Sequence, residues 1–216
     1  MLFEGTFKHL PSTKPTSSND ASGKGSILPD TELWRAFKSG DEAAFIQLYN
    51  QFAGPLFNYG CQFCQDREMV KDCLQDFFIY LRKNRSGFND TGFIKMYLFK
   101  AFRRRIVDYL RKHRKERQHS GESLYFQFPV ELSSENIYID NQFEEQQIRR
   151  LNDALNAHDA KEREAIYYFY FQGLGYEQIA EIFNFSHVSS ARRLMYRGLA
   201  QLRRLIGILM LIAFSS

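Results

Sequence analysis

Apolar residues recur every three to four positions along most of the chain, which is the spacing of one face of an α-helix. Between residues 41 and 52 they form a single stripe, made of Ala44, Phe45, Leu48, Tyr49 and Phe52. The same pattern covers 30–115 and returns over 143–207, and no segment of any length alternates as a strand would. We therefore expect an all-α fold with two small helical domains.

Polar residues between the apolar stripes indicate where helices begin. Ser39 or Asp41 is the expected N-cap of the helix that carries the stripe above, because either side chain can accept a hydrogen bond from a free backbone N–H. A separate helix is expected over 56–64, and Asp66 is expected to open the next one. The turn-rich loop 86–92 then follows that helix.

The two domains are expected to be separated and flanked by segments without helical signals. Residues 1–29 are rich in Pro, Ser and Gly and cannot bury enough apolar surface to fold, so they are predicted to be disordered. The helical pattern also fails over 116–142, which is polar and acidic and predicts a flexible linker. The domains are then 30–115 and 143–207, followed by an apolar C-terminal tail at 208–216.

Charge is distributed unevenly, although the formal net charge of the 216 residues is only +4. Between Lys95 and Arg117 ten residues are Lys or Arg and two are acidic. The segment 187–204 has five Arg and no acidic residue, whereas 122–164 has ten acidic residues against four basic ones. Two basic stretches indicate a polyanionic partner contacted at two places, although such stretches also occur as plain solvated helix faces.

The cysteines and the apolar runs limit the class of protein. Cys61, Cys64 and Cys73 are few and odd in number, which argues against a disulfide framework and fits a reducing cytoplasm. The longest apolar run, 206–214, is far shorter than the roughly 20 residues of a membrane span, and no signal-peptide pattern is present. We expect a soluble cytoplasmic protein without direct membrane insertion. A redox or metal-responsive protein built on the cysteines is an alternative, but a structural zinc site needs about four ligands.

Residues 173–186, which read GLGYEQIAEIFNFS, have the spacing of a helix-turn-helix. Ala180 is small enough for two helices to cross closely, Asn184 suits a left-handed turn residue, and Ser186 can cap the next helix. That helix carries three arginines, Arg192, Arg193 and Arg197. A basic helix in this position fits the major groove of DNA, with its N-terminal half against base edges. The alternative is a plain helical hairpin.

This motif resembles region 4 of the sigma-70 family, in factors of the extracytoplasmic-function (ECF) type, whose pattern is roughly GLSYEEIAEILGIS followed by a helix that begins TVKSRL. The resemblance implies that 187–197 reads the promoter −35 element. The side chains it assigns to the DNA groove are Ser189, Arg192, Arg193, Met195, Tyr196 and Arg197. Ser190 stands where the family usually has a core Val, Ala191 where a basic residue often contacts DNA, and Arg192 where Ser is usual. These departures leave the −35 sequence preference open.

A second motif, at 70–78, predicts a helix with one polar and one apolar face. Asp72, Gln75 and Asp76 lie at i, i+3 and i+4 and therefore share one side of the helix. The segment resembles region 2.2 of the same family. The resemblance implies that this face binds the clamp helices of the β′ subunit of core RNA polymerase, although an ordinary solvated helix face has the same pattern.

The segment 97–112, YLFKAFRRRIVDYLRK, interleaves basic and aromatic residues on a helix expected over 93–115. Such a helix suits opened DNA, because Lys and Arg bind phosphates and rings stack on unpaired bases. The segment resembles sigma regions 2.3–2.4. The resemblance implies binding to the −10 promoter element, with a flipped base held by the preceding loop. The candidate −10 residues are Phe88, Asp90, Tyr97, Lys100, Arg103, Arg104, Arg105, Arg111 and Lys112. Core packing is the alternative for Tyr97 and Phe102, and Arg104 stands where these factors usually have Asn.

Together these resemblances identify the chain as an alternative sigma factor, closest in arrangement to the factors of the Bacteroidetes type. We expect the protein not to be an enzyme and to need neither a cofactor nor a metal. We expect its partners to be core RNA polymerase, through the β′ clamp helices and the β flap, and promoter DNA. The resemblance also implies an anti-sigma factor as a partner. A stand-alone helix-turn-helix regulator is the alternative, but it would leave the first domain unexplained, and no heptad seam for dimerisation is visible.

Overall fold

The structure, a computed structural model, describes residues 29–64, 66–117 and 159–213, with side chains up to residue 112 in the second range and up to residue 200 in the third. Every regular element in these ranges is helical. In chain order they are α1 (Asp30–Ser39), α2 (Glu42–Cys61), α3 (Arg67–Lys83), η2 (Arg85–Gly87), α4 (Ile94–Arg117), α6 (Ala160–Ile166), η3 (Tyr167–Phe171), α7 (Tyr176–Ile182) and α8 (Val188–Ala213). The expected all-α fold is therefore confirmed. The expected N-terminal tail, the expected linker and the first part of the second domain, 143–158, lie outside the described residues, apart from residues 29, 116 and 117.

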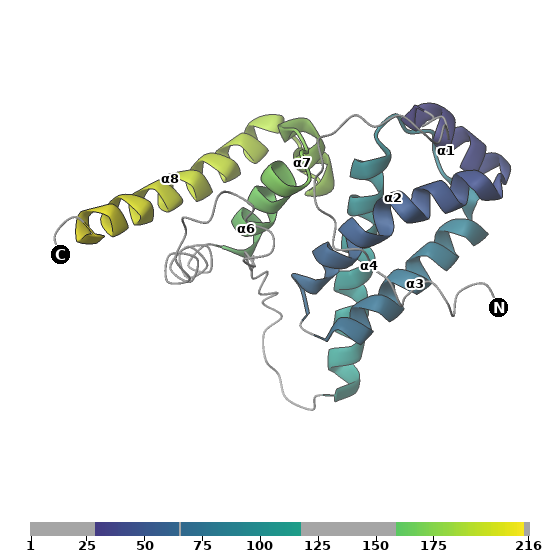
Figure 1. Ribbon diagram of the computed structural model, residues 1–216, viewed down its shortest axis with the longest axis horizontal. Coiled ribbons are helices and arrows are strands. Elements are labelled where there is room, and N and C mark those ends of the chain that lie inside the picture. The colour runs from purple at the N-terminus through teal and green to yellow at the C-terminus, as the bar shows by residue number, and fades with distance from the viewer. Residues whose placement is uncertain (1–28, 65, 118–158, 214–216) are drawn as a thin grey trace, which may run out of the picture.

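The first four α-helices pack around an aromatic core (Figure 1). α2 contacts α1, α3 and α4, and α3 also contacts α4. Large buried side chains come from all four helices, among them Trp34, Phe37, Phe52, Phe57, Phe77, Phe78, Phe99 and Phe102. Gly60 lies at the crossing of α2 and α3, since a Cβ there would be 2.6 Å from Cγ1 of Val70. The missing side chain therefore lets the two helices approach closely.

Two of the predicted helix starts are confirmed. Asp41 precedes α2, and its carboxylate accepts hydrogen bonds from the backbone N–H groups of Ala43 (2.8 Å) and Ala44 (3.3 Å). Asp66 precedes α3 and accepts one from the N–H of Met69 (3.1 Å). Each carboxylate satisfies donors that have no partner inside the helix, and its charge lies at the positive end of the helix dipole.

One predicted boundary is wrong. The sequence indicated separate helices on either side of residue 55, but α2 continues from Glu42 to Cys61 with Pro55 inside it. A proline in a helix interior removes one hydrogen bond and crowds the preceding turn, at a cost of about 3 kcal/mol. Phe52, Leu56 and Phe57 are all buried around it. Because both halves of α2 pack on the same core, tertiary packing outweighs the local preference for a break.

The second group of helices contains the predicted helix-turn-helix. α6 continues directly into the π-helical turn η3, and α7 and α8 follow a turn at Gly173, whose φ is 64°. Asn184, between α7 and α8, has a φ of 54° and is the only non-glycine residue with positive φ among those described. The left-handed turn predicted there is therefore confirmed. α8 begins at Val188, so His187 rather than Ser186 directly precedes it.

α8 is longer than the sequence indicated. It extends to Ala213, so the domain boundary expected at 207 falls within a helix and most of the apolar tail continues that helix. Figure 1 shows its C-terminal half extending away from the other helices. In the described part of the chain, no helix combines the length and the apolar character required to cross a membrane.

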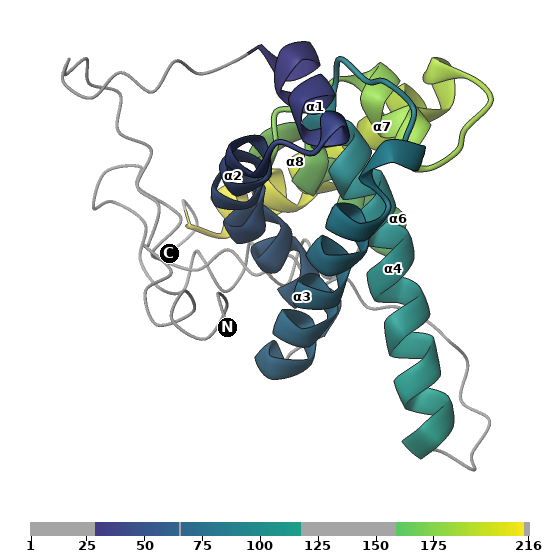
Figure 2. The ribbon, with the colours of Figure 1, turned by 90° about the vertical axis from the view of Figure 1, so that its right-hand side faces the viewer.

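The two groups of helices lie against each other. α7 contacts α4, and Figures 1 and 2 both show α6 and α7 beside the first group. Tyr59 of α2 and Tyr168 of η3 are both fully buried, with their rings stacked at a centroid distance of 5.4 Å. A single buried core therefore continues from one group of helices into the other.

Candidate polymerase and nucleic-acid interfaces

The polar face predicted on α3 is exposed. Asp72, Gln75 and Asp76 all lie on the surface, while the opposite face of the helix is buried in the core. One of the three has a partner, since Nη2 of Arg105 on α4 is 3.8 Å from Oδ2 of Asp76. An exposed pair at that distance contributes little to stability. The face is therefore accessible to a protein partner.

The loop 86–92, before α4, carries two candidate −10 residues, Phe88 and Asp90. It packs against the aromatic core and does not form an open pocket around both of them. The indole N–H of Trp34 donates a hydrogen bond to the carbonyl of Asn89 at 2.9 Å. Phe88 is half-buried and packs against the rings of Trp34 and Tyr97, with centroids 6.1 and 6.0 Å away. Asp90 is exposed and bonded to Lys38, which lowers the pKa of Asp90. Phe88 therefore anchors the loop, and Asp90 lies at its surface.

The candidate residues of α4 separate onto different faces of the helix. Arg104, Arg111 and Lys112 are exposed, and Nη1 of Arg111 is 3.4 Å from Oδ1 of Asp108. Arg104 and Arg111 are seven positions apart and share one face with Tyr97, which is half-buried. Phe102 is fully buried, so core packing is confirmed for that residue. Fewer residues of the motif are therefore exposed on α4 than the sequence indicated.

The side chain of Arg105, on α4, extends toward the exposed polar face of α3. Its guanidinium is 5.6 Å from the centre of the Tyr80 ring, and it also approaches Asp76. Its Nε is buried and has no hydrogen-bond partner among the described residues. Arg105 therefore contributes to the α3–α4 junction as well as to the basic surface.

Lys100 and Arg103 are half-buried and contact acidic residues of the second group of helices. Lys100 forms an ion pair with Glu181 of α7. Arg103 donates two hydrogen bonds to Glu164 of α6, from Nε at 2.7 Å and from Nη2 at 3.0 Å, and stacks over the ring of Phe183 at 5.2 Å. In this arrangement both basic side chains are occupied by carboxylates of the same chain.

Glu164 is the centre of a buried polar network that the sequence did not reveal. Its side chain is only 4% exposed, and Oε1 accepts hydrogen bonds from the hydroxyls of Tyr59 at 2.6 Å and Tyr168 at 3.0 Å. Burial, together with the Glu164 charge, raises the pKa of both tyrosines well above the ordinary value. Burial alone would lower the pKa of Arg103, but Glu164 outweighs it and raises that pKa. The one signal in the sequence is an acid directly before the apolar run AIYYF.

The helix-turn-helix presents most, but not all, of its predicted contacts. Ile179 and Ala180 of α7 and Leu194 of α8 are buried between the helices. The exposed candidates on α8 are Ser189, Arg192, Arg193, Tyr196 and Arg197. Two of them also have contacts within the chain: Arg192 lies 5.7 Å from the centre of the Tyr176 ring, and Arg197 is 3.2 Å from Glu162.

Met195 cannot contact DNA, and its assignment to the groove is wrong. Its side chain is 0% exposed, as is that of Ala191 one turn earlier. These two positions are four residues apart and lie on the side of α8 that packs inward. Ala191 is therefore a core position and not a lost DNA contact, while Arg192 and Arg193 beside it point outward.

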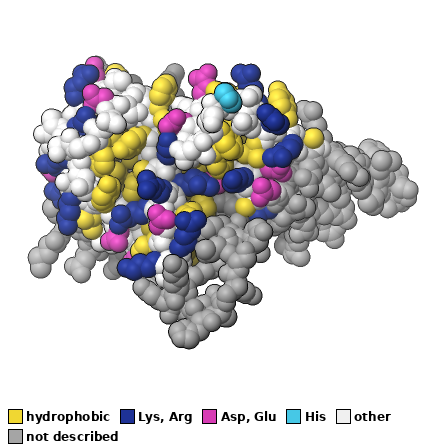
Figure 3. Space-filling model, turned by 180° about the vertical axis from the view of Figure 1, so that it is seen from behind, with side chains coloured by type: hydrophobic (Ala, Val, Ile, Leu, Met, Phe, Trp, Pro, Cys, Tyr) yellow, Lys and Arg dark blue, Asp and Glu magenta, His cyan; other side chains and the backbone are white. Residues whose placement is uncertain are grey.

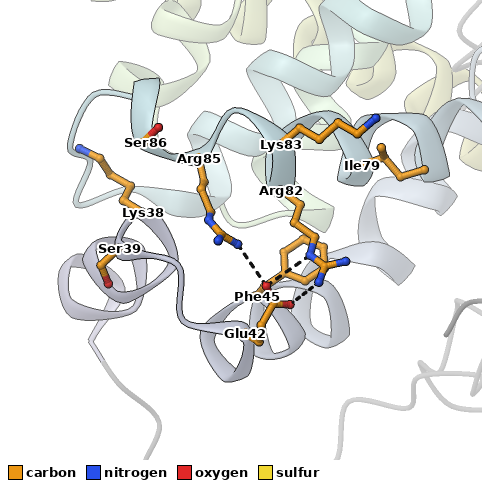
Figure 4. A pocket seen from close by; sticks show the side chains of 9 residues that line it. All are labelled: Lys38, Ser39, Glu42, Phe45, Ile79, Arg82, Lys83, Arg85 and Ser86. Atoms are coloured by element: carbon orange, nitrogen blue, oxygen red, sulfur yellow. Dashed lines mark hydrogen bonds and ion pairs between the residues drawn. The ribbon is translucent and has the colours of Figure 1, made fainter.

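A shallow pocket of about 540 Å³ lies between α1, α2 and α3 (Figure 4). Four basic side chains line it: Lys38, Arg82, Lys83 and Arg85. Arg82 and Arg85 both point to the carboxylate of Glu42, at 2.9 and 3.1 Å. The carboxylate of Glu42 therefore balances the charge of two of these cations. Its ion pair with Arg85 connects η2 to the start of α2.

The cysteines do not gather with other ligand side chains. Cys73 is buried, Cys61 and Cys64 are half-buried, and Sγ of Cys64 lies 4.0 Å from the sulfur of Met69. Within the ranges that the structure describes, no three His, Cys, Asp or Glu side chains are close enough to hold a metal ion.

One face of the molecule combines basic and apolar side chains. Figure 3 shows Lys and Arg gathered across the middle of the face opposite to that of Figure 1, with hydrophobic side chains between them. Exposed aromatic residues of the described chain include Tyr80, Phe93, Tyr170, Phe171 and Tyr196. Of these rings, Tyr80 has the guanidinium of Arg105 beside it, 5.6 Å from the ring centre. A cation beside an exposed ring suits the binding of nucleic acid through phosphates and base stacking.

Comparison with known families and structures agrees with this architecture. The family model "Sigma-70 region 2" matches residues 48–116, and "Sigma-70, region 4" matches residues 148–202. The ECF RNA polymerase sigma factor SigK of Mycolicibacterium vanbaalenii is 24% identical over 82% of this chain and 88% of its own. The ECF RNA polymerase sigma factor SigM of Bacillus subtilis is 23% identical over 74% of this chain and 93% of its own.

Two solved structures share the fold. CnrH, in complex with the cytosolic domain of CnrY, superposes with a TM-score of 0.57 at 20% identity, covering 84% of this chain and 99% of CnrH. The sigma factor RpoE in complex with the anti-sigma factor NepR, from Bartonella quintana, gives a TM-score of 0.54 at 22% identity, covering 76% and 97%.

A basic aromatic helix in one group of helices and a helix-turn-helix in the other define a DNA-binding protein of transcription initiation. The chain belongs to the sigma-70 family and is an ECF sigma factor with regions 2 and 4. It is a non-catalytic protein that directs promoter recognition by RNA polymerase.

Proposed function

We propose that this sigma factor docks on core RNA polymerase through Asp72, Gln75 and Asp76, which meet the clamp helices of the β′ subunit. The observation that carries the proposal is the exposure of all three on one face of α3. That face adjoins the basic helix α4, where Arg105 reaches Asp76. A polymerase-binding face next to a DNA-binding helix lets one rigid unit hold both partners in a fixed relation.

The exposed stripe of α4 supports binding to the −10 element. Arg104 and Arg111 are both exposed and lie on the same face of α4. Such side chains bind backbone phosphates and release counterions. Phe88 and Tyr97 lie directly beside the stripe and supply rings at the edge of the loop. Arg104, in place of the usual Asn, favours phosphate binding over base reading.

Region 4 reads the −35 element in this proposal through the exposed side of α8. Ser189, Arg192 and Arg193 lie in its first two turns, near its N-terminus. This is the part of a recognition helix that contacts base edges in the major groove. Tyr196 and Arg197, one turn later, are suited to the flanking backbone.

Further partners follow from the family and from the neighbours in fold. The β flap of polymerase is the proposed second contact, made by region 4. The two solved relatives are bound to partner proteins, one of them a named anti-sigma factor. We extend this to an anti-sigma factor for the present chain. The narrower likeness to factors of the Bacteroidetes type stays a prediction, carried by the string YLFKAFRRRIVDYLRK.

Charge reversal tests the docking face. The double variant Asp72→Lys/Asp76→Lys is expected to lose binding to core polymerase in a pull-down while keeping its far-UV circular dichroism spectrum. Glu32→Lys/Glu177→Lys is the matched control, because it makes the same charge change at two exposed residues away from this face. Undiminished binding by the first variant would place the polymerase contact elsewhere.

Sequencing of the transcripts initiated by the polymerase–sigma complex, followed by run-off transcription, tests the promoter assignment. Arg104→Ala is expected to weaken binding of the holoenzyme to the promoters so found, and to reduce the salt dependence of binding by about one unit in the log–log slope. Arg193→Ala is expected to relax discrimination at one −35 position instead. An unchanged slope for Arg104→Ala would remove that residue from the phosphate contacts.

A further inference from the structure

Three sulfur-containing side chains lie together where α2 ends and α3 begins. Cys61 is the last residue of α2, Cys64 follows it three positions later, and Met69 belongs to the first turn of α3. All three are half-buried and pack against the hydrophobic core. The proposed contacts with polymerase and DNA use none of them, so they are available for a separate role.

The backbone at the end of α2 brings these sulfur atoms close to one another. The N–H of Phe63 donates a hydrogen bond to the carbonyl of Gly60 at 2.9 Å. A turn closed by a bond between such positions has about three residues, so side chains three positions apart lie on the same side. Cys61 and Cys64 are such a pair. The chain then turns into α3, and Sγ of Cys64 lies 4.0 Å from the sulfur of Met69.

The thiol of Cys61 has both a second thiol and cations near it. Burial raises the pKa of Cys61, and a negative charge on Cys64 raises it further. Arg67 and Lys71 act in the opposite direction and lower that pKa. All three groups therefore lie within electrostatic reach of the Cys61 sulfur. A negatively charged complex formed at this sulfur has two cations beside it.

We propose that Cys61, Cys64 and Met69 form a binding site for a soft monovalent metal ion, Cu(I). Thiolate and thioether sulfurs are the ligands that Cu(I) prefers in proteins. Metal–thiolate bonds are about 2.3 Å long, so two sulfur atoms on one ion lie at most about 4.6 Å apart. The separation of 4.0 Å between the sulfurs of Cys64 and Met69 is within that limit.

The charges of the complex match its surroundings. On binding, both thiols release their protons to solvent, and the two thiolates and the thioether donate electron pairs to the ion without any transfer of an electron. Two thiolates and one Cu(I) leave a single negative charge in a half-buried place, where an unpaired charge is unfavourable. Arg67 and Lys71 offset that charge.

The same ligand set is unsuited to zinc. A structural zinc site needs about four ligands, drawn from Cys, His, Asp and Glu. Within the part of the chain that the structure describes, no third side chain of these types joins Cys61 and Cys64. Met69 is not a usual zinc ligand, but its thioether suits Cu(I). The cluster therefore favours a soft monovalent ion over a divalent one.

Anaerobic titration of Cu(I) into the reduced full chain tests the site. The chromophoric chelator bathocuproine disulfonate competes for the ion, and its absorbance reports how much the protein retains. The unaltered chain is expected to retain about one Cu(I), with sulfur as the neighbouring atom in X-ray absorption spectra. Its melting temperature is expected to rise, because the three sulfurs come together only in the folded chain and ligands of the folded state stabilise it.

Substitutions separate the ligands from the other sulfur atoms of region 2. Cys61→Ser and Cys64→Ser are each expected to weaken Cu(I) binding more than about 100-fold, which exceeds the loss usual for a residue that only supports a ligand. Met69→Leu keeps the size but removes the sulfur, and a loss of about tenfold is expected. The matched controls are Cys73→Ala and Met96→Leu, which lie elsewhere in region 2 and are expected to change affinity by less than about twofold.

Far-UV circular dichroism verifies that each variant is folded, and Cys61→Ala replaces Cys61→Ser if the latter loses helical content. Failure of the unaltered chain to retain Cu(I) would overturn the inference, as would equal affinities of Cys61→Ser and Cys73→Ala. Equal affinities of Met69→Leu and Met96→Leu would overturn the three-sulfur site, and Zn(II) binding as tight as that of Cu(I) would overturn its selectivity. Because neither polymerase nor DNA is present, these outcomes leave the polymerase and promoter assignments intact.

Discussion

The close approach at Gly60 allows a quantitative prediction about the core of region 2. A Cβ at this position would lie 2.6 Å from Cγ1 of Val70 and 3.3 Å from Cε1 of Phe102. Carbon atoms in contact are normally about 3.5–4.0 Å apart, so Gly60→Ala forces an overlap of roughly 1 Å with Val70. Overpacking of this kind costs about 1–3 kcal/mol, while alanine in place of a helical glycine returns about 1 kcal/mol. We expect Gly60→Ala to lower the free energy of unfolding by about 1 kcal/mol.

A second substitution at the contact isolates the packing effect. Val70→Ala alone removes two buried methyl groups and is expected to cost about 2 kcal/mol. In the double variant the new methyl group at position 60 enters the space that Val70 vacated. The double variant is therefore expected to be more stable than the sum of the single effects by about 1–2 kcal/mol.

Urea unfolding followed by far-UV circular dichroism measures these differences. Asn50 lies exposed in the middle of the same helix, so the pair Asn50→Ala and Asn50→Gly gives the alanine–glycine difference without packing. The reasoning fails if Gly60→Ala stabilises the protein as much as that pair implies. Additivity of the Gly60 and Val70 effects within about 0.5 kcal/mol would refute it equally.

Three further predictions concern the turn, the thiols and the buried tyrosines. Asn184→Val is expected to lower the free energy of unfolding by about 1–2 kcal/mol, because a branched side chain strains the left-handed turn, whereas Asn184→Gly is tolerated. Melting temperatures measure the difference, and equal values for the two variants would contradict this prediction. Burial raises the pKa of Cys73 to about 12, so iodoacetamide should leave it unlabelled at pH 8 in peptide mapping, and rapid labelling of the native protein would show that it is exposed. The pKa values of Tyr59 and Tyr168 in the folded protein lie above the value of about 10 in the unfolded chain. The stability that the two tyrosines contribute is therefore complete below about pH 10 and is lost as the pH rises above 10. Tyr168→Phe is therefore expected to flatten the decline of stability above about pH 10 in urea titrations, and an unchanged slope would exclude this origin.

Features set by a few neighbouring residues could be predicted from the sequence. The caps Asp41 and Asp66 and the left-handed Asn184 each follow from local backbone chemistry, and all three are found in the structure. The exposure of Asp72 and Asp76 on one face of α3 follows from helical periodicity in the same way.

Features set by tertiary packing could not be predicted. A proline normally ends a helix, but Pro55 lies inside α2 because the residues around it share one core. Met195 was assigned to DNA by its position in the motif, although the inward side of α8 includes it. Glu164 meets Tyr59 across 105 positions of the chain, and no local pattern contains that pairing.

The indole of Trp34 has a consequence for spectroscopy. The chain has a single tryptophan, and that side chain is bonded to the backbone of the loop before α4 and packed against Phe88 and Tyr97. Fluorescence excited selectively in tryptophan therefore comes from one place in the molecule. The tryptophan fluorescence of the unlabelled protein therefore reports on the contact between α1 and that loop, and a ligand that displaces Phe88 changes the wavelength and intensity of the emission without any dye being attached.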